Sequence, residues 1–395
     1  PGDMVGLTDG ERSWMCGFDT LILAAGARDI ALAFPGWDQP GVIGARALRT
    51  LVAEYDAFSG RRIAILGSGD LAVRTALMAA DKGLDVAGLV EIGPQALASA
   101  QALQELSAAG IPVMTGAQIR GATGGPDGVT ALGIIDAAGR SADLACDTVC
   151  VAIGLAPAIE LLDASHGQTA PQTRLGGHAP VLIGWKTSHP GVFVAGDAAG
   201  LTPDSETAAL QGRQAARQAL GLETEGAPSP GPDAWAVQTA WHAALTRHAG
   251  PDLIVCQCEA VTRADLLEVR APRYLGDPTP AAKDRPLTRL IEDGPANPDQ
   301  IKRLTRAGMG PCQGRRCREQ VALTLAEAAG AGVETIPLAQ HRAPVRPLPL
   351  SVIADWQETA AMSAGWEIWF AIPGQWTPYA DIGTPRETER AGWGS

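Results

Sequence analysis

Short apolar runs that end in glycine alternate with helical patterns along residues 12–220. Residues 61–69 (RRIAILGSG) predict a buried strand, residues 70–83 predict a helix that stops at glycine, and residues 84–91 predict the next strand. The same patterns predict further strands and helices at residues 12–26, 44–58, 95–110, 148–157, 191–197 and 205–220. Such alternation is typical of α/β domains with parallel sheets.

Two stretches interrupt this alternation. Residues 27–42 are rich in Pro and Gly and predict a loop, whereas residues 116–147 predict antiparallel hairpins around the turn GATGGPDG. After residue 220 the pattern changes, because residues 221–233 have the composition of a linker. The remainder predicts a mainly helical segment, with helices near residues 234–249, 262–270, 298–307 and 316–330.

Composition excludes several classes of protein. The chain has 395 residues, which is enough for two or three domains, and its net charge of −12 argues against nucleic-acid binding. No run of 18 apolar residues occurs, so the sequence predicts no membrane span. Seven cysteines are too few for a disulfide framework, and their close pairs favour metal ligands in a reducing compartment. We therefore expect a cytoplasmic location.

A G-x-G-x-x-A turn joins the predicted strand and helix of residues 61–83. Gly67 makes the tight turn, Gly69 lets a pyrophosphate approach the backbone, and Ala72 permits close packing of helix against strand. Glu91 ends the next strand, where a carboxylate accepts ribose hydroxyls and favours NAD over NADP. The turn predicts a site for NAD or another adenine nucleotide. The alternative is a Rossmann-like domain that binds no nicotinamide. Asp70 does not fit this pattern, because its negative charge would lie beside the expected pyrophosphate.

A second strand-to-glycine motif is GVFVAGDAAG, in which Gly196 and Asp197 follow an apolar strand at the start of a helix. An aspartate there accepts hydrogen bonds from sugar-like hydroxyls, while the helix amides face an anion or a polarised carbonyl. Taken alone, the motif fits an aspartate that caps its helix better than a ligand-binding aspartate.

Four cysteines form two close pairs in the C-terminal half. Cys256 and Cys258 form C-x-C, and Cys312 and Cys317 form C-x4-C in a glycine-rich segment. Glycine lets the backbone bring its N–H groups near sulfur, and four thiolates are the ligand set of an iron–sulfur cluster. Structural zinc is the main alternative, although zinc sites usually use C-x-x-C on both sides. A disulfide pair is a further alternative.

The remaining candidate residues carry little chemistry. Cys146 and Cys150 flank a predicted strand, and we expect them to pack in the core. The six histidines show no metal spacing, and His242 and His248 on a predicted helix are expected at the surface. The last residues are rich in Pro and Trp (GWEIWFAIPGQW) and fit either an interface or a small satellite core.

In this order, the motifs resemble the glutathione-reductase-like flavoproteins with two dinucleotide-binding domains. There, a segment like FDTLILAAGAR closes the first half of the FAD domain, a unit like residues 63–91 opens an inserted NAD domain, and VCVAIGLAPAIELL returns to the FAD domain. The resemblance implies that Gly26, Gly196 and Asp197 contact FAD. The segments CQCEAVTRADLL and RAGMGPCQGRRC resemble the [2Fe-2S] domain of bacterioferritin-associated ferredoxins, with Cys256, Cys258, Cys312 and Cys317 as ligands.

Together the two halves resemble the FAD/[2Fe-2S] subunit of heteromeric amine, opine and imino-acid dehydrogenases. RAPVRPLPL resembles the segment that follows the cluster domain in that group. The resemblance implies an oxidoreductase subunit of a hetero-oligomer. An amine-oxidising flavoprotein partner would break the C–N bond of an amino acid, imino acid or opine, and electrons would leave to an external acceptor. No acid or base of this chain is implied in catalysis.

Two departures from the family pattern matter. The chain starts at Pro1 without the first GxGxxG, so we expect a fragment that lacks an N-terminal stretch and FAD binding by the full-length protein. The gap between the cysteine pairs looks long, with a Pro-rich insertion near residues 271–295.

The expected FAD and NAD regions contain no redox C-x-x-C, which argues against disulfide-reductase chemistry.

The sequence thus predicts glutathione-reductase-like Rossmann-type domains plus a small, mainly helical cluster domain. We expect the first half of the FAD domain at residues 1–45, the NAD-like domain at 46–147 and the return of the FAD domain at 148–222. A linker follows at 223–250, then the cluster domain at 251–330 and a Pro/Trp-rich tail at 331–395. One alternative function is an NADH-dependent reductase of a ferredoxin-like acceptor. Another is a non-catalytic assembly protein that holds zinc and a nucleotide.

Overall fold

The computed structural model describes residues 4–272, 286–354, 360–364 and 384–386, in two compact units. One unit comprises residues 1–18 and 348–395. In it, β1 (Met4–Thr8) and β2 (Ser13–Gly17) form an antiparallel hairpin, and α12 (Leu350–Ala354) and α13 (Ala360–Ala364) follow from the other end of the chain. The hydroxyl of Ser13 donates to the carbonyl of Val352 at 3.2 Å.

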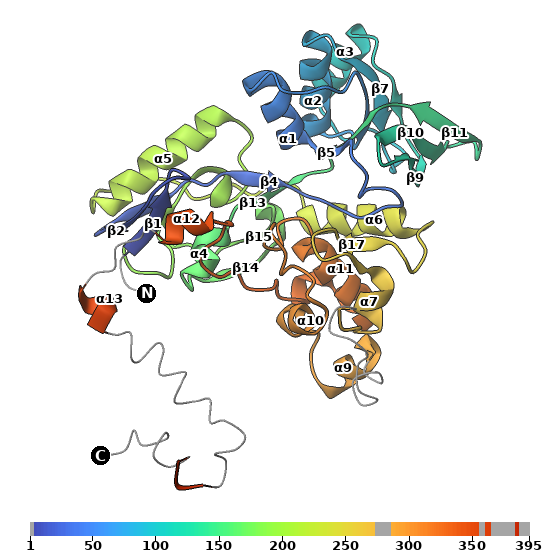
Figure 1. Ribbon diagram of the computed structural model, residues 1–395. Helices are drawn as coiled ribbons and strands as arrows, with labels where there is room; N and C mark the ends of the chain where they lie inside the picture. The colour runs from blue at the N-terminus through green and yellow to red at the C-terminus, as the bar shows by residue number, and fades with distance from the viewer. Residues whose placement is uncertain (1–3, 273–285, 355–359, 365–383, 387–395) are drawn as a thin grey trace. The chain divides into compact units, whose positions relative to one another are not determined.

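The larger unit, residues 19–347, contains a five-stranded parallel sheet (Figure 1). Its strands, in spatial order, are β5 (Val42–Gly44), β12 (Thr148–Val151), β6 (Arg62–Leu66), β7 (Asp85–Val90) and β8 (Val113–Met114). The helices that accompany them are α1 (Ala45–Arg49), the π-helical turn η1 (Thr50–Glu54), α2 (Asp70–Asp81) and α3 (Ala100–Ala108). The predicted βαβ unit is confirmed, because β6 and β7 are adjacent and parallel with α2 between them in sequence.

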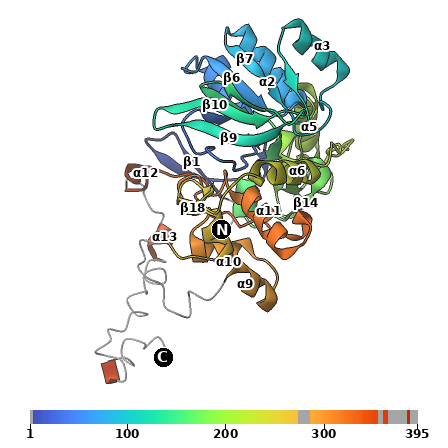
Figure 2. The same cartoon turned by 90° about the vertical axis from the view of Figure 1, so that its right-hand side faces the viewer.

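The apolar periodicity accounts for this layer. Four of the five residues of β6 are buried, and α2 buries Ala72, Val73, Ala76 and Ala79 at helical spacing. The predicted hairpins are also present as a three-stranded antiparallel sheet (Figure 2). This sheet is formed by β9 (Gln118–Gly125), β10 (Gly128–Ile135) and β11 (Ser141–Ala145).

Short two-stranded sheets make up the part for which the sequence predicts an FAD domain. They pair β3 (Leu21–Leu23) with β16 (Val192–Val194), β4 (Ala27–Asp29) with β13 (Leu155–Pro157), and β14 (Thr169–Gln172) with β15 (Gly177–Pro180). Three short helical segments and one long helix accompany them, α4 (Glu160–Ala164), η2 (Thr173–Leu175), η3 (Gly196–Ala198) and α5 (Ser205–Ala219). The prediction of an uninterrupted loop over residues 27–42 was wrong, because β4 and β5 lie at its ends and gain their hydrogen bonds from strands more than 100 residues later.

The C-terminal part of the larger unit is mainly helical, as predicted. It contains α6 (Ala234–Thr246), the small hairpin β17 (Ile254–Cys256) and β18 (Val261–Thr262), α7 (Arg263–Leu267), α9 (Leu287–Asp293), α10 (Pro298–Thr305), α11 (Arg318–Ala329) and η5 (Val333–Thr335). The helix predicted near residues 262–270 is present as α7, and a capping box of Thr262 and Asp265 begins it. One apolar core runs through this part and the sheets before it, from Ile30 and Phe34 to Cys256 and Leu323.

Within the described residues, no helix is long and apolar enough to cross a membrane. Two predictions fall outside the description. Residues 273–285 of the Pro-rich insertion are not described, and neither is the Trp-rich segment 365–376. The α/β fold class with an additional helical segment is confirmed.

Candidate functional site

Four thiols from two distant stretches of the chain meet in two pairs. Cys256 ends β17 and Cys258 lies in the turn after it, while Cys312 and Cys317 lie in the loop before α11. The thiol of Cys256 interacts with that of Cys317, and the thiol of Cys258 interacts with that of Cys312. The fold therefore brings the four predicted ligands together as two pairs.

The two pairs differ in their access to solvent. Cys256 and Cys317 are each 1% exposed, whereas Cys312 is half-buried and Cys258 is exposed. One end of the site faces the protein core and the other faces the surface. A group held by these thiols would thus be reachable by an electron donor or acceptor from outside.

Glycines shape the loop that closes over the sulfur atoms. The backbone N–H of Gly308 points at Cys256 Sγ, with nitrogen and sulfur 3.5 Å apart. Gly308 has a φ of 84°, in the left-handed region that side chains disfavour. A side chain at Gly310 would collide with Cys258. The glycine-rich segment therefore brings its backbone close to sulfur, as predicted.

The electrostatics of the inner pair favour a thiolate. The neighbouring thiol of Cys317, helped by the backbone amides of Gly308 and Glu259, lowers the pKa of Cys256 to about 6 against the effect of burial. The proximity of Cys256 and burial raise the pKa of Cys317. Cys317 also precedes the first turn of α11, where the helix N-terminus favours negative charge. Thiolate is the form that binds metals.

An ion pair that sequence reasoning missed ties the two ligand segments together. Arg306 donates to Glu259, with Nε and Oε2 2.8 Å apart, so the residue after Cys258 is fixed to the loop before Cys312. Arg306 has a φ of 66° and ends α10 in the left-handed conformation. No local motif signals this pair, because the two residues are 47 positions apart.

The four thiols form two pairs, and they do not surround one common point. In the parts of the chain that the structure describes, no group of three or more His, Cys, Asp or Glu side chains is placed to hold a single metal ion. A two-iron cluster places two thiolates on each iron, so paired thiols fit such a cluster.

The predicted dinucleotide turn is formed, with one difference. Gly67 has a φ of 110°, and a side chain there would come within 2.7 Å of the carbonyl of Ala152, so glycine is required. Gly69 precedes α2, and Ala72 in the first turn of that helix is fully buried. Glu91, however, is 2% exposed.

Both oxygens of the Glu91 carboxylate are already bonded within the protein. They accept from the Ser68 hydroxyl at 2.6 Å and from the Gly93 amide at 2.9 Å. The loop after β7 also folds onto the turn, because Leu97 N donates to Ser68 Oγ at 3.0 Å. A ribose can reach this carboxylate only by displacing these bonds.

The predicted flavin-contacting residues lie around one arginine. Asp197 accepts from Thr202 through N at 2.9 Å and Oγ1 at 2.6 Å, and it pairs with Arg46 at 3.3 Å. The Arg46 guanidinium lies beside Gly26, where a side chain would come within 3.8 Å of it. Gly26 and Gly196 both have positive φ. Arg46 was missed from the sequence, because it lies on α1 outside any motif.

Three expectations about other residues have different outcomes. Cys146 and Cys150 are buried in the core, as predicted. His242 is 6% exposed, so the prediction of a surface position was wrong. Helix α11 packs against α6 on that side. The local sequence pattern of α6 does not indicate this contact. His248 is exposed, as expected.

Comparison with known proteins agrees with this fold. A model of the pyridine nucleotide-disulphide oxidoreductase family matches residues 7–219, more than half of the chain. The chain belongs to this family. A model of the sarcosine oxidase A3 domain matches residues 282–356, which include Cys312 and Cys317.

Two relatives of this family member are components of larger enzymes. An opine oxidase subunit of Agrobacterium tumefaciens (strain Ach5) is 26% identical, over 91% of this chain and 74% of that protein. Hydrogen cyanide synthase subunit HcnB of Pseudomonas aeruginosa is 26% identical, over 88% of this chain and 78% of that protein. The resemblance to this group of oxidoreductase subunits is thereby confirmed, while the [2Fe-2S] ligands remain a prediction.

A solved structure supports the fold alone. L-Proline dehydrogenase from P. horikoshii superposes with a TM-score of 0.61 at 20% identity, over 89% of this chain. The chain spans 61% of the length of that protein.

Proposed function

We propose that this chain is the flavin- and [2Fe-2S]-dependent subunit of a hetero-oligomeric C–N dehydrogenase or oxidase. An amine-oxidising flavoprotein partner oxidises an amino acid, imino acid or opine, and this subunit relays the electrons to an external acceptor. The observation that carries the proposal is the meeting of four thiols in two pairs within one compact unit that also contains the dinucleotide-binding fold. The relationship to the opine oxidase subunit supports the substrate class.

Cys256, Cys258, Cys312 and Cys317 are the proposed ligands of the cluster. When bound, the cluster supplies one-electron transfer to a chain whose own side chains cannot accept electrons. The protein contributes thiolates, a Gly308 amide aimed at Cys256 and a solvent-facing edge at Cys258. Hydrogen bonds to sulfur and exposure to solvent are two features that set the potential of such a cluster.

FAD is the proposed flavin of the full-length protein, with Gly26, Gly196 and Asp197 as contacts. Asp197 Oδ1 accepts twice from Thr202, whereas Oδ2 pairs only with Arg46. Because a carboxylate oxygen has two lone pairs, Oδ2 can still accept from a ribityl-type hydroxyl. The positive φ of both glycines supports close approach of backbone to a ligand.

Gly67, Gly69, Ala72 and Glu91 form the proposed second nucleotide site, for NAD or another adenine nucleotide. The turn and the α2 N-terminus support phosphate binding. The internal bonds of Glu91 argue against a role as ribose acceptor in the present conformation.

We keep the sequence-derived segments 1–45, 46–147, 148–222, 223–250, 251–330 and 331–395 as proposed domain boundaries.

Metal analysis tests the proposal directly. We expect two irons and two acid-labile sulfides per chain and a brown protein. Cys312→Ser should abolish the visible bands, whereas Cys146→Ser, in a buried cysteine outside the site, should keep them. One zinc in a colourless protein would refute the cluster and favour the non-catalytic assembly protein instead.

A kinetic experiment separates the proposal from an NADH-dependent reductase. In the full-length protein, the flavin should stay oxidised when NADH is added alone. It should be reduced when the amine-oxidising partner and its substrate are present. Rapid bleaching by NADH without the partner would favour the reductase instead.

A further inference from the structure

Six ionisable side chains are buried beside the proposed cluster ligands. The exposed fractions of the side chains lie between 3% and 13%, and they belong to Arg28, Glu160, Asp163, Arg318, Glu319 and His341. They come from β4, α4, the start of α11 and the segment after η5. Burying a charge is costly unless it is paired and hydrogen-bonded, and a buried ion pair is weak evidence of added stability. A group of this kind therefore calls for an explanation other than stability.

Arg28 lies at the centre of this buried network and uses its whole guanidinium. Its Nε donates to Glu160 Oε1 at 3.0 Å, and its two terminal nitrogens form a bidentate pair with Glu319, one of them at 3.1 Å from Oε2. Nη1 also donates to the backbone carbonyl of Arg315 at 3.0 Å. Although burial opposes the charged form, Glu319 and Glu160 raise the pKa of Arg28, so its charge persists.

The contacts of Arg28 lie on both sides of one proposed ligand. Arg315 precedes Cys317 by two residues within the Cys312–Cys317 loop, and Glu319 follows Cys317 by two residues in the first turn of α11. On β4, Arg28 itself follows Gly26 of the proposed flavin site by two residues. A single side chain thus joins the two proposed cofactor sites.

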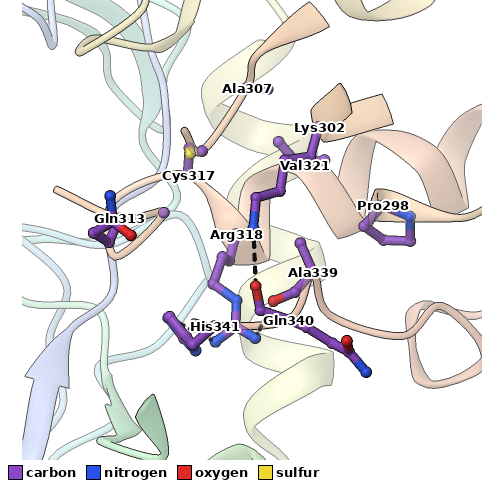
Figure 3. A pocket seen from close by; sticks show the side chains of 12 residues that line it. Pro298, Lys302, Ala307, Gln313, Cys317, Arg318, Val321, Ala339, Gln340 and His341 are labelled. Atoms are coloured by element: carbon purple, nitrogen blue, oxygen red, sulfur yellow. Dashed lines mark hydrogen bonds between the residues drawn. The ribbon is translucent and has the colours of Figure 1, made fainter. Parts of the chain in front are cut away.

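A second set of bonds, to Asp163 on α4 and to His341, holds the same helical turn. Arg318 donates to Asp163 and to His341 Nε2, each at 3.3 Å, while His341 Nδ1 lies 3.0 Å from the same Asp163 oxygen. Figure 3 shows Arg318 extending from the Cys317 end of the helix toward His341 across a small cavity. Apolar packing of α11 fixes its depth in the core, and the directional bonds of Arg318 and Glu319 also fix its rotation and the position of Cys317.

We propose that Arg28 is a positioning residue for the iron–sulfur site, which holds the Cys312–Cys317 loop against β4 and so fixes Cys317 beside Cys256. The inference rests on the proposed function, since the cluster ligands are themselves proposed. Arg28 touches neither the cluster nor substrate. Its role is to set where the sulfur lies and how far the cluster stands from the flavin-contacting strand.

The test compares Arg28→Met and Glu319→Gln with Glu160→Gln. All three break the buried network, but Glu160 contacts the Arg28 Nε at 3.0 Å and the Arg315 side chain only at 3.9 Å, and it does not contact the backbone of the cysteine loop, so Glu160→Gln is the matched control. Loss of a residue that orients metal ligands costs about 10- to 100-fold in metal affinity. We expect about a 10-fold or greater loss of iron affinity in Arg28→Met, a smaller loss in Glu319→Gln and no loss in Glu160→Gln. The visible and EPR spectra should shift in the first two variants only.

A second measurement needs no cluster. In the metal-free full chain, diamide accepts the two electrons and two protons released when Cys256 and Cys317 form a disulfide. Peptide mapping gives the rate of that crosslink. We expect wild type and Glu160→Gln to crosslink at the same rate, and Arg28→Met and Glu319→Gln to crosslink several-fold more slowly. Circular dichroism and thermal midpoints check that each variant is folded at the temperature of the assay.

The outcomes separate the two proposals. If wild type binds no iron, the proposed function fails, and the crosslinking rates alone decide whether Arg28 positions Cys317. If Arg28→Met binds iron and crosslinks like wild type, the inference is overturned. It is overturned equally if Glu160→Gln loses as much iron affinity as Arg28→Met, because the effect would then be general destabilisation. Should Arg28→Met fail to fold, Glu319→Gln against Glu160→Gln makes the same comparison.

Discussion

The backbone amide of Gly308 donates to the sulfur of Cys256, with nitrogen and sulfur 3.5 Å apart across 52 positions of sequence. Gly308 has a φ of 84°, a conformation that glycine adopts without the strain of a side chain. The loop that carries the second cysteine pair thereby also contributes to the electrostatics of the first pair.

Gly308→Ala should weaken the proposed cluster. An alanine in the left-handed region costs roughly 1–2 kcal/mol. Relaxation of that strain would move the amide away from Cys256, and the new methyl group would lie 3.7 Å from Cys317 Sγ. We expect lower iron occupancy and a shifted reduction potential, measured by metal analysis and by redox titration of the visible bands.

Gly330→Ala is the control for the glycine prediction. Gly330 also has positive φ, at 59°, and no atom would contact its added methyl group. It should lose a similar amount of stability while it keeps the cluster spectrum. Equal effects of the two substitutions on the spectrum would show that the Gly308 amide has no specific role.

Glu91→Gln should destabilise the protein in the absence of any nucleotide. The carboxylate accepts from Ser68 and Gly93 in a buried position, and loss of a buried hydrogen bond of this kind costs about 1–3 kcal/mol. The urea midpoint should fall accordingly. Asp85→Asn, which breaks a largely exposed pair with Arg62, should change stability by less than about 1 kcal/mol.

An opposite pattern would support a ribose-binding role for Glu91. In that case Glu91→Gln would leave the urea midpoint unchanged and would weaken the binding of NAD or another adenine nucleotide, measured by calorimetric titration.

The stability of the larger unit should depend on His178 below pH 6.5. Burial, and then the nearby charge of Arg318, lower the pKa of His178 from 6.5 to about 4. Between these two values the unfolded state binds more protons than the folded state. His178 therefore costs nothing above about pH 6.5, and the penalty grows to about 3 kcal/mol as the pH falls toward 4.

His178→Asn removes this proton linkage. Unfolding free energies of wild type and variant, measured between pH 4 and 8, should differ by a constant above pH 7 and converge or cross as the pH falls. Parallel curves over the whole range would contradict the lowered pKa of His178.

Asp197→Asn should weaken flavin retention in the full-length protein. An asparagine oxygen can still accept from Thr202 and keep the local turn, so the substitution removes mainly the charge that faces Arg46. A hydrogen bond to a charged group contributes about 1.5–3 kcal/mol, which corresponds to roughly a 10- to 100-fold change in FAD affinity. Fluorescence of released flavin measures it.

Asp204→Asn is the matched control for the flavin prediction. Asp204 caps α5 by accepting from the Thr207 amide at 2.7 Å, and asparagine caps helices about as well as aspartate. Its flavin content should equal that of wild type. If both variants retain flavin equally, Asp197 does not contact FAD.

Local periodicity was enough to find most elements of this fold. The β6–α2–β7 unit, the hairpins of residues 116–147 and the capping box at Thr262 all depend on neighbours within a few residues. The need for glycine at position 67 could likewise be inferred, since a tight strand-to-helix turn imposes it whatever the rest of the chain does.

Residue type and spacing also identified the four thiols, but not their partners. Pairing of Cys256 with Cys317, burial of His242 and the bond from Arg28 to Glu319, 291 positions later, all depend on how distant elements pack. Periods of two and 3.6 residues record which face of an element is apolar. They do not record which other element covers that face, and that covering brings the buried charges and sulfur atoms into contact.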